Sequence, residues 1–385
     1  MVRPVARMAT MAKVDGMFPG WAHLVDWTSA QAIVPFLGLL HLTGLAGDPR
    51  EIAEAILISI LQVLIIACLF RPLESLMPAE RWTDRRLTRV DWQYTLMMLL
   101  GIFPMFSYLV LTPISHLFGG DDDGTTTASG IALWIPGLNG HPLLLFLVYY
   151  AIYDLVYYWM HRLQHALPWW WALHSMHHST RQMSCWTNDR GSLVDGFLQS
   201  MVLAAVGLFI GVAPTEFAWL MLIGELVQNF SHANVRVRFG PVLDRVLVSP
   251  VFHRLHHMRV DPDRPTLHDC NYGQVFAIWD TLFGTALHGE PIRPTGVGDP
   301  MVDADNDKGL VGLHWAALRR FWGAVTCRAG WRLGDVAFSE AHRPIPVSEL
   351  DLHALEGMHA SMPSTPAAIS ITVEPSTEQT RTASA

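Results

Sequence analysis

Charged residues are scarce in this sequence, and lysine is almost absent. Asp, Glu, Lys and Arg together make up 16% of the chain, whereas soluble proteins contain roughly 25%. Only Lys13 and Lys308 are lysines, while apolar residues account for 51% of the chain and the mean hydropathy is +0.26. These values predict a membrane protein. The formal net charge of −8 excludes the basic surface that binds nucleic acid.

Cysteine is also rare, and several common motifs are missing. The four cysteines contain no C-x-x-C pair, which excludes a disulfide framework and a thiolate zinc site. Without G-x-G-x-x-G or H-P-G-G, the sequence has no fused dinucleotide-binding or cytochrome b-type domain. The absence of H-E-x-x-H and G-x-S-x-G excludes a zinc protease and a lipase.

Long apolar runs dominate the first two thirds of the chain. A helix that crosses a bilayer needs about 20 mostly apolar residues. Ile52–Phe70, Tyr94–Leu111 and Leu143–Met160 meet this requirement, and Phe197–Phe230 is long enough for two passes with a turn at Ala213-Pro214. Ala32–Leu45 is shorter, and it either spans the membrane, re-enters it or lies on its surface. We expect an all-α membrane protein with about four transmembrane helices.

Arginine counts predict the orientation of these helices. The loop from Arg71 to Asp91 carries five arginines, whereas the loop from Thr112 to Pro142 carries neither Arg nor Lys. Cytoplasmic loops are enriched in these residues. We therefore expect the first loop in the cytoplasm, and with it the segments 161–196 and 231–385.

The composition divides the chain into four segments. We expect residues 1–50 to form an N-terminal segment with or without a membrane-associated helix. We expect residues 51–290, which contain the apolar runs and the histidine motifs described below, to form a membrane catalytic domain. Residues 291–345 form a cytosolic segment in which Gly309–Trp331 has the pattern of an interfacial amphipathic helix. Residues 346–385 are rich in Ser, Thr, Pro and Ala from about Ser361 onward, and we expect a disordered tail.

Histidine is the residue type that carries the chemistry. Of the 19 histidines, a group concentrated between residues 161 and 268 consists of His161, His165, His174, His177, His178, His232, His253, His256, His257 and His268. Eight of these occur in three motifs with spacings of three or four residues. On a helix this spacing places side chains on one face, so each motif projects several imidazoles in one direction.

These ten histidines predict a metal centre at one membrane face. Imidazole nitrogen binds iron, zinc, copper or nickel, and eight or more such groups are too many for a single ion. Two ions with five imidazoles each would leave one position of an octahedron open. The sequence therefore predicts a two-metal centre, and it does not decide which metal is bound.

At these residues the chain resembles the fatty acid hydroxylase/sterol desaturase superfamily of integral membrane di-iron enzymes. The superfamily pattern H-x(3–4)-H, H-x(2–3)-H-H and H-x(2–3)-H-H is matched here by HRLQH, HSMHH and HRLHH. The flanking sequences YDLVYYWMHR, FSHANVRVRFG and NYGQVFAIWDTLFGT also fit. Val235 and Arg236 stand where some relatives have another histidine, and His268 is the candidate to replace it.

The resemblance implies a fold and an activity. The fold is a four-helix membrane stem with a cytosolic helical cap that holds two iron ions, for which zinc can substitute in preparations. The activity is oxygen-dependent hydroxylation or desaturation of a fatty acyl chain, a sterol or a related lipid, and we favour hydroxylation. Electrons would come from a separate ferredoxin- or cytochrome b-type partner or from a soluble reductant.

Acidic and polar residues near the motifs are further candidates. Asp154 and Glu225 lie inside apolar runs, each seven residues before a motif histidine. They either orient ligand imidazoles, line the substrate passage or bind a neighbouring span. Asp280 either supports ligands or caps a helix. A group that follows the second motif either shapes the cap or binds a lipid headgroup: Arg181, Asn188, Asp189 and Arg190.

Two functions of other classes also fit a histidine-rich membrane protein. A metal-ion transporter would use the imidazoles as binding sites, although its ligands would be expected within the spans. A bis-histidine haem protein would use them as axial ligands for electron transfer. Helical spacing and the position of the histidines beyond the spans favour the oxygenase over both.

Overall fold

The computed structural model of the protein describes residues 20–42, 48–82, 84–111, 130–210, 214–260 and 269–326. Within these residues the chain is helical and contains no β-strand, which confirms the predicted all-α class. Two isolated β-bridges are present in the same part of the chain, between Pro78 and Val235 and between Met258 and Thr295. His268 and the predicted disordered tail lie outside the described residues.

The first half of the chain forms helices in which α-helical and π-helical stretches alternate. Their bounds are α2 (Trp21–Thr28), η1 (Ser29–Ile33), α3 (Val34–Leu39), α4 (Pro49–Ile65), η2 (Ile66–Phe70), α5 (Arg71–Leu76), α6 (Thr88–Met97), η3 (Met98–Ile102), α7 (Phe103–Phe106) and η4 (Ser107–Leu111). Here η1 to η4 are π-helical.

The second half contains the longest helices and most of the short ones. Their bounds are α9 (Ile131–Trp134), η5 (Pro136–Gly140), α10 (Pro142–Ala166), α11 (Pro168–His178), η6 (Thr187–Asp189), α12 (Leu193–Ile210), α13 (Pro214–His232), η7 (Leu243–Arg245), α14 (Pro250–His256), α15 (Ile278–Phe283), α16 (Pro300–Asp303), η8 (Ala304–Asp307) and α17 (Gly309–Val325). The η elements of this half are 3-10 helices.

Three helical stretches are long and apolar enough to cross a bilayer. They are Pro49–Leu76, Thr88–Val110 and Leu143–Ala166, and they coincide with the three uninterrupted runs predicted from the sequence. The predicted double pass is occupied by α12 and α13, and α13 begins at Pro214 as expected. A shorter apolar stretch, Leu193–Gly207, lies in α12. That both helices cross the membrane stays a prediction.

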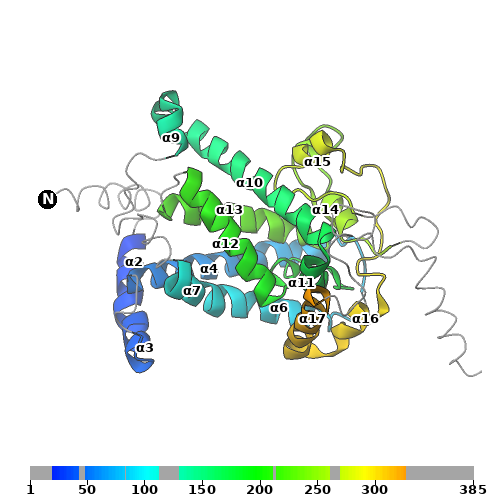
Figure 1. Cartoon of the computed structure of the whole chain (residues 1–385), viewed down its shortest axis with the longest axis horizontal. Coiled ribbons are helices and arrows are strands. Elements are labelled where there is room, and N and C mark those ends of the chain that lie inside the picture. The colour runs from blue at the N-terminus through cyan, green and yellow to red at the C-terminus, as the bar shows by residue number, and fades with distance from the viewer. Residues whose placement is uncertain are drawn as a thin grey trace, which may run out of the picture. The chain divides into compact units, whose positions relative to one another are not determined.

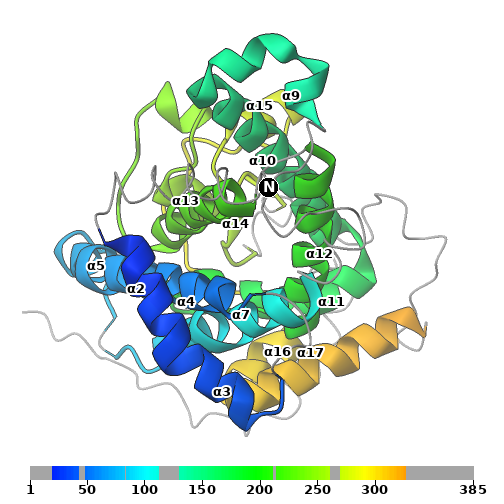
Figure 2. The same cartoon turned by 90° about the vertical axis from the view of Figure 1, so that its left-hand side faces the viewer.

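The long helices lie alongside one another, and the short C-terminal helices gather at one end. Figure 1 shows α4, α10, α12 and α13 side by side, with α11, α14, α15 and α17 at the end where α10 and α13 finish. In Figure 2 the helices α2 and α3 pass across the opposite end, where α2 packs on α4. A cluster of buried aromatic residues on α10, including Tyr150 and Tyr153, packs between α10 and α12.

Caps and prolines determine where the helices near the histidines begin. Pro168 occupies the first turn of α11 after Leu167 leaves the helical conformation, so α10 and α11 are separate helices. Ser249 caps α14, its hydroxyl accepting from the Phe252 amide at 3.4 Å, and Pro250 follows at the first helical position. Proline at this position loses no helical hydrogen bond and has a suitable φ.

A buried carboxylate on α5 is hydrogen bonded to the segments that follow two of the histidine-bearing helices. Glu74 of α5 is 0% exposed and accepts hydrogen bonds from the amides of Cys185 and Asn234, at 2.8 and 2.9 Å. These amides lie in the chain after α11 and after α13. Glu74 therefore fixes the loops on both sides of the histidine-bearing helices.

The helix α17 differs in part from the amphipathic helix that the sequence predicts. It begins at Gly309 as expected and ends at Val325, and the rest of the predicted range, from 327 to 331, lies outside the described residues. Leu313, Ala317 and Ala324 are buried, and α17 packs extensively on α11. Trp315 and Trp322 are more than half exposed on another face. The helix thus covers α11 as well as presenting tryptophans outward.

Candidate metal centre

Nine of the ten predicted histidines come together at the end of the bundle. Two lie on α10, three on α11, one on α13 and two on α14, and the ninth, His257, is the C-cap residue of α14. Eight of the nine are at most 6% exposed. The tenth, His268, lies outside the described residues. The sequence prediction that distant motifs meet is therefore confirmed for the described histidines.

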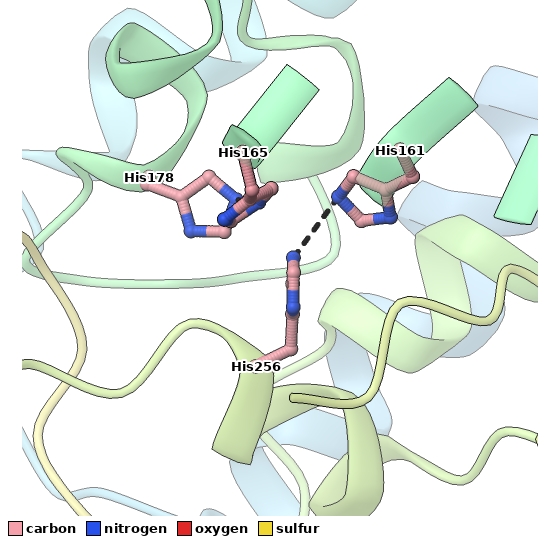
Figure 3. Close-up of side chains that lie close together, drawn as sticks. All are labelled: His161, His165, His178 and His256. Carbon is pink, nitrogen blue, oxygen red and sulfur yellow. Dashed lines mark hydrogen bonds between the residues drawn. The ribbon is translucent and has the colours of Figure 1, made fainter. Parts of the chain in front are cut away.

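One group of four histidines joins three helices. His161, His165, His178 and His256 each have a ring nitrogen within 4.8 Å of those of the other three. Figure 3 shows the rings converging from the ends of α10, α11 and α14. The Nε2 atoms of His161 and His256 are 3.0 Å apart, and those of His165 and His178 are 3.1 Å apart.

A second set of histidines continues from the first. His177, His178 and His257 form one close group, and His232, His253 and His257 form another. The rings of His178 and His257 stack with centroids 4.2 Å apart, so the two regions are in direct contact. His174 belongs to no close group, but its ring lies 5.0–5.3 Å from its four neighbours, His161, His165, His177 and His178.

The spacing of the nitrogens fits metal ligation. Two nitrogen ligands at right angles, with bonds of about 2.1 Å, lie about 3.0 Å apart. Four Nε2–Nε2 pairs in the cluster are separated by 3.0–3.2 Å. Buried ring nitrogens without hydrogen-bond partners remain at His174, His253 and His257. Such atoms destabilise a fold unless something binds them, and a metal ion would do so.

The other ring nitrogen of several histidines is bound by the protein. The Nδ1 atoms of His161 and His256 lie 2.9 and 2.7 Å from the carbonyl oxygens of Tyr272 and Cys270. His174 Nδ1 lies 2.9 Å from Asp195. Because these oxygens accept hydrogen bonds, the protons are placed on Nδ1 and the Nε2 lone pairs point into the cluster.

Burial keeps several of the rings neutral. It holds the pKa of His178, His256 and His257 well below the ordinary value, and neighbouring imidazoles lower each pKa further. A neutral imidazole has the lone pair that a metal requires, whereas a protonated one does not. The cluster is therefore chemically suited to bind cations near neutral pH without first losing protons.

The comparisons with known proteins cover this part of the chain. Residues 146–285 match the fatty acid hydroxylase family. That segment spans the last part of the bundle and all nine described histidines. This segment, residues 146–285, belongs to the fatty acid hydroxylase/sterol desaturase superfamily.

Similar proteins are lipid-modifying enzymes of different kinds. The alkylglycerol monooxygenase of Danio rerio is 35% identical over 34% of this chain and 28% of its own length. The ornithine lipid hydroxylase of Rhizobium tropici is 33% identical over 36% of this chain and 40% of its own length. A delta(7)-sterol 5(6)-desaturase of Gibberella zeae is 28% identical over 43% and 47%, respectively. The matched region is thus less than half of each relative.

No solved structure matches the chain significantly. The family match of residues 146–285, together with the three apolar helical stretches, identifies the chain as an integral membrane protein.

Two of the predicted acids bind protein groups other than histidine rings. Asp154 accepts from the amides of Val275 and Phe276, each at 3.0 Å, and from the Trp279 indole at 2.9 Å. Glu225 accepts from Asn188 at 2.6 Å. Asp154 therefore secures the segment after Tyr272, which belongs to none of the three apolar stretches. A role for either acid in ligand orientation remains a prediction.

Asp280 supports the same segment from the other side. Its carboxylate accepts from the amides of Tyr272 and Gly273 at 2.7 and 2.8 Å, and from the Thr285 hydroxyl at 2.7 Å. It thus holds in place the carbonyl of Tyr272, to which His161 is hydrogen bonded. A Cβ at Gly273 would lie 2.7 Å from the Phe276 carbonyl oxygen, so only glycine fits in this turn.

Sequence reasoning missed two residues that support the histidines. Asp195 could have been found as Asp154 was, because it is an acid at the start of an apolar helix. Asn271 carries no such signal. It adopts φ 58°, and its side chain accepts from the Leu287 amide at 2.7 Å and donates to the Phe252 carbonyl at 2.8 Å. These bonds hold the carbonyls on either side of Asn271 against His161 and His256.

Proposed function

We propose that this protein is an O2-dependent di-iron lipid hydroxylase that acts at the cytoplasmic face of the membrane. Its reaction would convert a C–H bond of a fatty acyl chain, a sterol or a related lipid into an alcohol. The observation that carries this proposal is the cluster of nine histidines, eight of them buried, at the end of apolar helices, in a segment that matches the fatty acid hydroxylase family.

The proposed ligands form two neighbouring sets. One ion would be held by His161, His165, His178 and His256, which already form a close group. The other would be held by the remaining histidines, which are His174, His177, His232, His253, His257 and, from outside the described residues, His268. Two iron ions would supply oxygen activation. Zinc could replace iron in preparations, because imidazole binds both.

The protein groups around the rings keep them in a fixed orientation. Tyr272, Cys270 and Asp195 hold Nδ1 protons, so that each Nε2 faces the centre. Burial excludes bulk water, which protects reactive species from side reactions. Because α10 and α13 each end at the cluster, a lipid lying between the spans would reach it without leaving the membrane.

The lipid class is proposed from the relatives. Two of those described above are named as hydroxylating or monooxygenating enzymes, with an alkylglycerol or an ornithine lipid in the name, and one as a sterol desaturase. Hydroxylation is the preferred reaction because the more similar relatives carry it out by name. Desaturation of a sterol or another lipid on the same site is the alternative. In both cases electrons come from a separate ferredoxin- or cytochrome b-type donor or a soluble reductant.

The transporter alternative is disfavoured by the position of the ligands. A transporter needs a binding site that is reached in turn from both sides of the membrane. The nine described histidines lie together at one end of the bundle, and eight of them are buried.

The test is untargeted mass spectrometry of lipids from cells that express the protein with a supplied reductant. The control is a His177→Ala/His178→Ala variant at equal expression. We expect a species that gains one oxygen only with the intact histidines. A species that loses two hydrogens would establish the desaturase instead. Identical lipid profiles, also after feeding sterols, ether lipids and sphingoid bases, would contradict the enzyme proposal.

A further inference from the structure

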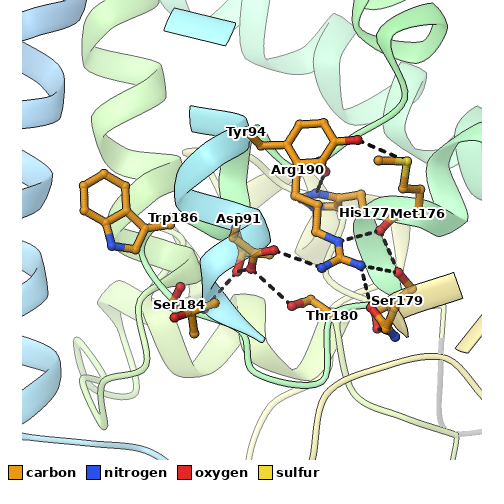
Figure 4. A network of polar contacts seen from close by, with 12 residues as sticks. Asp91, Tyr94, Met176, His177, Ser179, Thr180, Ser184, Trp186 and Arg190 are labelled. Atoms are coloured by element: carbon orange, nitrogen blue, oxygen red, sulfur yellow. Dashed lines mark hydrogen bonds and ion pairs between the residues drawn. The ribbon is translucent and has the colours of Figure 1, made fainter. Parts of the chain in front are cut away.

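A buried network of polar side chains lies directly behind His177. At its centre is Arg190, which is 3% exposed and pairs with the fully buried Asp91 of α6 at 2.9 Å. Figure 4 shows the guanidinium between Asp91 and the end of α11. Arginine is rarely buried unless it is paired, so this buried ion pair indicates a specific role inside the protein.

Arg190 contacts His177 and the backbone on both sides of it. Its carbonyl oxygen accepts from His177 Nδ1 at 2.9 Å. Its Nε donates to the carbonyl of Met176 at 3.1 Å, and its Nη2 donates to the Ser179 hydroxyl at 2.9 Å. One residue thus determines the ring tautomer of His177 and the position of the chain that carries it.

The guanidinium is itself held from two other elements. Asp91 belongs to α6 and also accepts from Thr187 and Thr180, at 2.8 and 3.3 Å. Asn306 of η8 accepts from Nη2 at 2.5 Å. A planar guanidinium with its donors in a fixed fork can satisfy all these partners at once, whereas a lysine ammonium cannot reach them together.

We infer that Arg190, held by Asp91 and Asn306, is a positioning residue that fixes His177 for one of the two metal ions. This inference rests on the two-ion centre proposed above. We expect Arg190 to act on one ion only, because its carbonyl binds Nδ1 of His177. In the other set of ligands, Nδ1 of His161 binds the Tyr272 carbonyl and Nδ1 of His256 binds the Cys270 carbonyl. His177 instead lies beside His232, with the Nε2 atoms 3.2 Å apart. The guanidinium is consequently not available to bind a lipid headgroup.

The test counts metal ions in the full-length protein. Protein purified in detergent, stripped of metal and kept free of oxygen is titrated with Fe²⁺. Wild type should bind about two ions. Arg190→Lys keeps the positive charge opposite Asp91 and loses the fork. We expect it to bind one ion with wild-type affinity and the other at least tenfold more weakly, which is the effect typical of residues that orient metal ligands.

Two kinds of control assign the effect. Arg181→Lys makes the same substitution in the same loop at an exposed arginine that pairs with Asp303, and it should bind two ions as wild type does. Combining Arg190→Lys with His232→Ala should weaken only the ion already affected. Combining it with His256→Ala should weaken both ions.

Each other outcome contradicts the inference. Two ions of wild-type affinity in Arg190→Lys would show that the network does not act on His177. Equal weakening of both ions would show a general structural role. If Arg190→Lys does not fold, Asn306→Ala removes one acceptor of the guanidinium together with the two bonds that the Asn306 amide donates to the Ser179 and Asp303 carbonyls. The same selective weakening is required of it. A wild-type protein that binds no Fe²⁺ would overturn the proposed centre, and the inference with it.

Discussion

Single side chains around the histidines determine how well the cluster can bind a cation. Asp195 is 2% exposed and accepts three hydrogen bonds: from His174 Nδ1 at 2.9 Å, and from Trp170 and Gln164 at 2.8 Å each. A carboxylate of this kind fixes the ring and raises its basicity. In the proposed centre this residue would act on the metal through His174.

Replacement of this carboxylate should weaken metal binding. In Asp195→Asn the side chain keeps its size and loses its charge, so His174 loses its anionic acceptor. We expect Fe²⁺ affinity to fall about 10–100-fold, as measured by anaerobic titration. Asp303→Asn, in an exposed pair with Arg181, is the control and should bind iron as wild type does. An unchanged affinity in Asp195→Asn would refute the orienting role.

Acid should destabilise the metal-free protein. Burial holds the pKa of His178, His256 and His257 well below its ordinary value of about 6.5. Below that pH the unfolded chain binds protons that the folded chain does not, so the free energy of unfolding falls as the pH falls. We expect the midpoint of thermal unfolding to be lower at pH 5.5 than at pH 7.5, by roughly 2–4 °C per kcal/mol lost.

A pair of histidine variants separates the cluster from the other histidines. His256→Asn removes one buried imidazole and should reduce the difference between the two pH values. His141→Asn changes an exposed histidine and should leave the difference intact. Equal pH dependence in all three proteins would show that the cluster histidines are not its source.

At the residue scale the sequence was informative about ligands and uninformative about their supports. Spacings of three and four predicted which imidazoles share a face, because a helix fixes those directions. The acceptors of Nδ1 are mostly backbone carbonyls, such as that of Tyr272, 111 positions from His161. Every residue has a carbonyl, so no residue type signals this role.

At the scale of elements, α17 is part of the wall behind the histidines. It packs on α11, and the Tyr94 hydroxyl of α6 is hydrogen bonded to His314 of α17. Ala317 is 0% exposed in the cluster that includes Met176, the residue before His177. A larger side chain at this position has no space and would push α17 away from α11.

Enlarging Ala317 should therefore loosen both the fold and the metal centre. For Ala317→Leu we expect a loss of about 1–3 kcal/mol in stability and faster loss of bound metal to a chelator. Unfolding by denaturant and the rate of metal release measure the two effects. Val311→Leu adds bulk at a residue that is 79% exposed and should change neither. Wild-type behaviour of Ala317→Leu would show that α17 does not support α11.

The sequence predicted elements well where one periodicity or one hydrophobic run decided them. The apolar runs matched the three spanning stretches because length and composition set the requirement. The amphipathic pattern of α17 was also found, but not its burial against α11. A hydrophobic stripe shows that a helix face is covered, and it does not show whether lipid or protein covers it.

At the scale of the whole molecule, the arginine distribution predicts which side of the membrane holds the centre. Arg86 is largely exposed in the loop predicted to be cytoplasmic, and His141 is exposed at the start of α10 on the opposite side. We expect His141→Cys to react with a membrane-impermeant maleimide in intact cells, and Arg86→Cys to react only after lysis. The wild-type protein is the control, because it measures the reaction of the native cysteines with the same maleimide. The reverse pattern would place the centre outside.

The length of α10 links the centre to the bilayer itself. This single helix of 25 residues is about 37 Å long at 1.5 Å per residue, and the hydrocarbon core is about 30 Å thick. His161 and His165 lie in its last two turns, so any tilt of the helix moves them with it. Membrane thickness then sets the depth of the histidine cluster, and for the proposed hydroxylase the lipid chain length becomes a variable of the reaction as well as of its substrate.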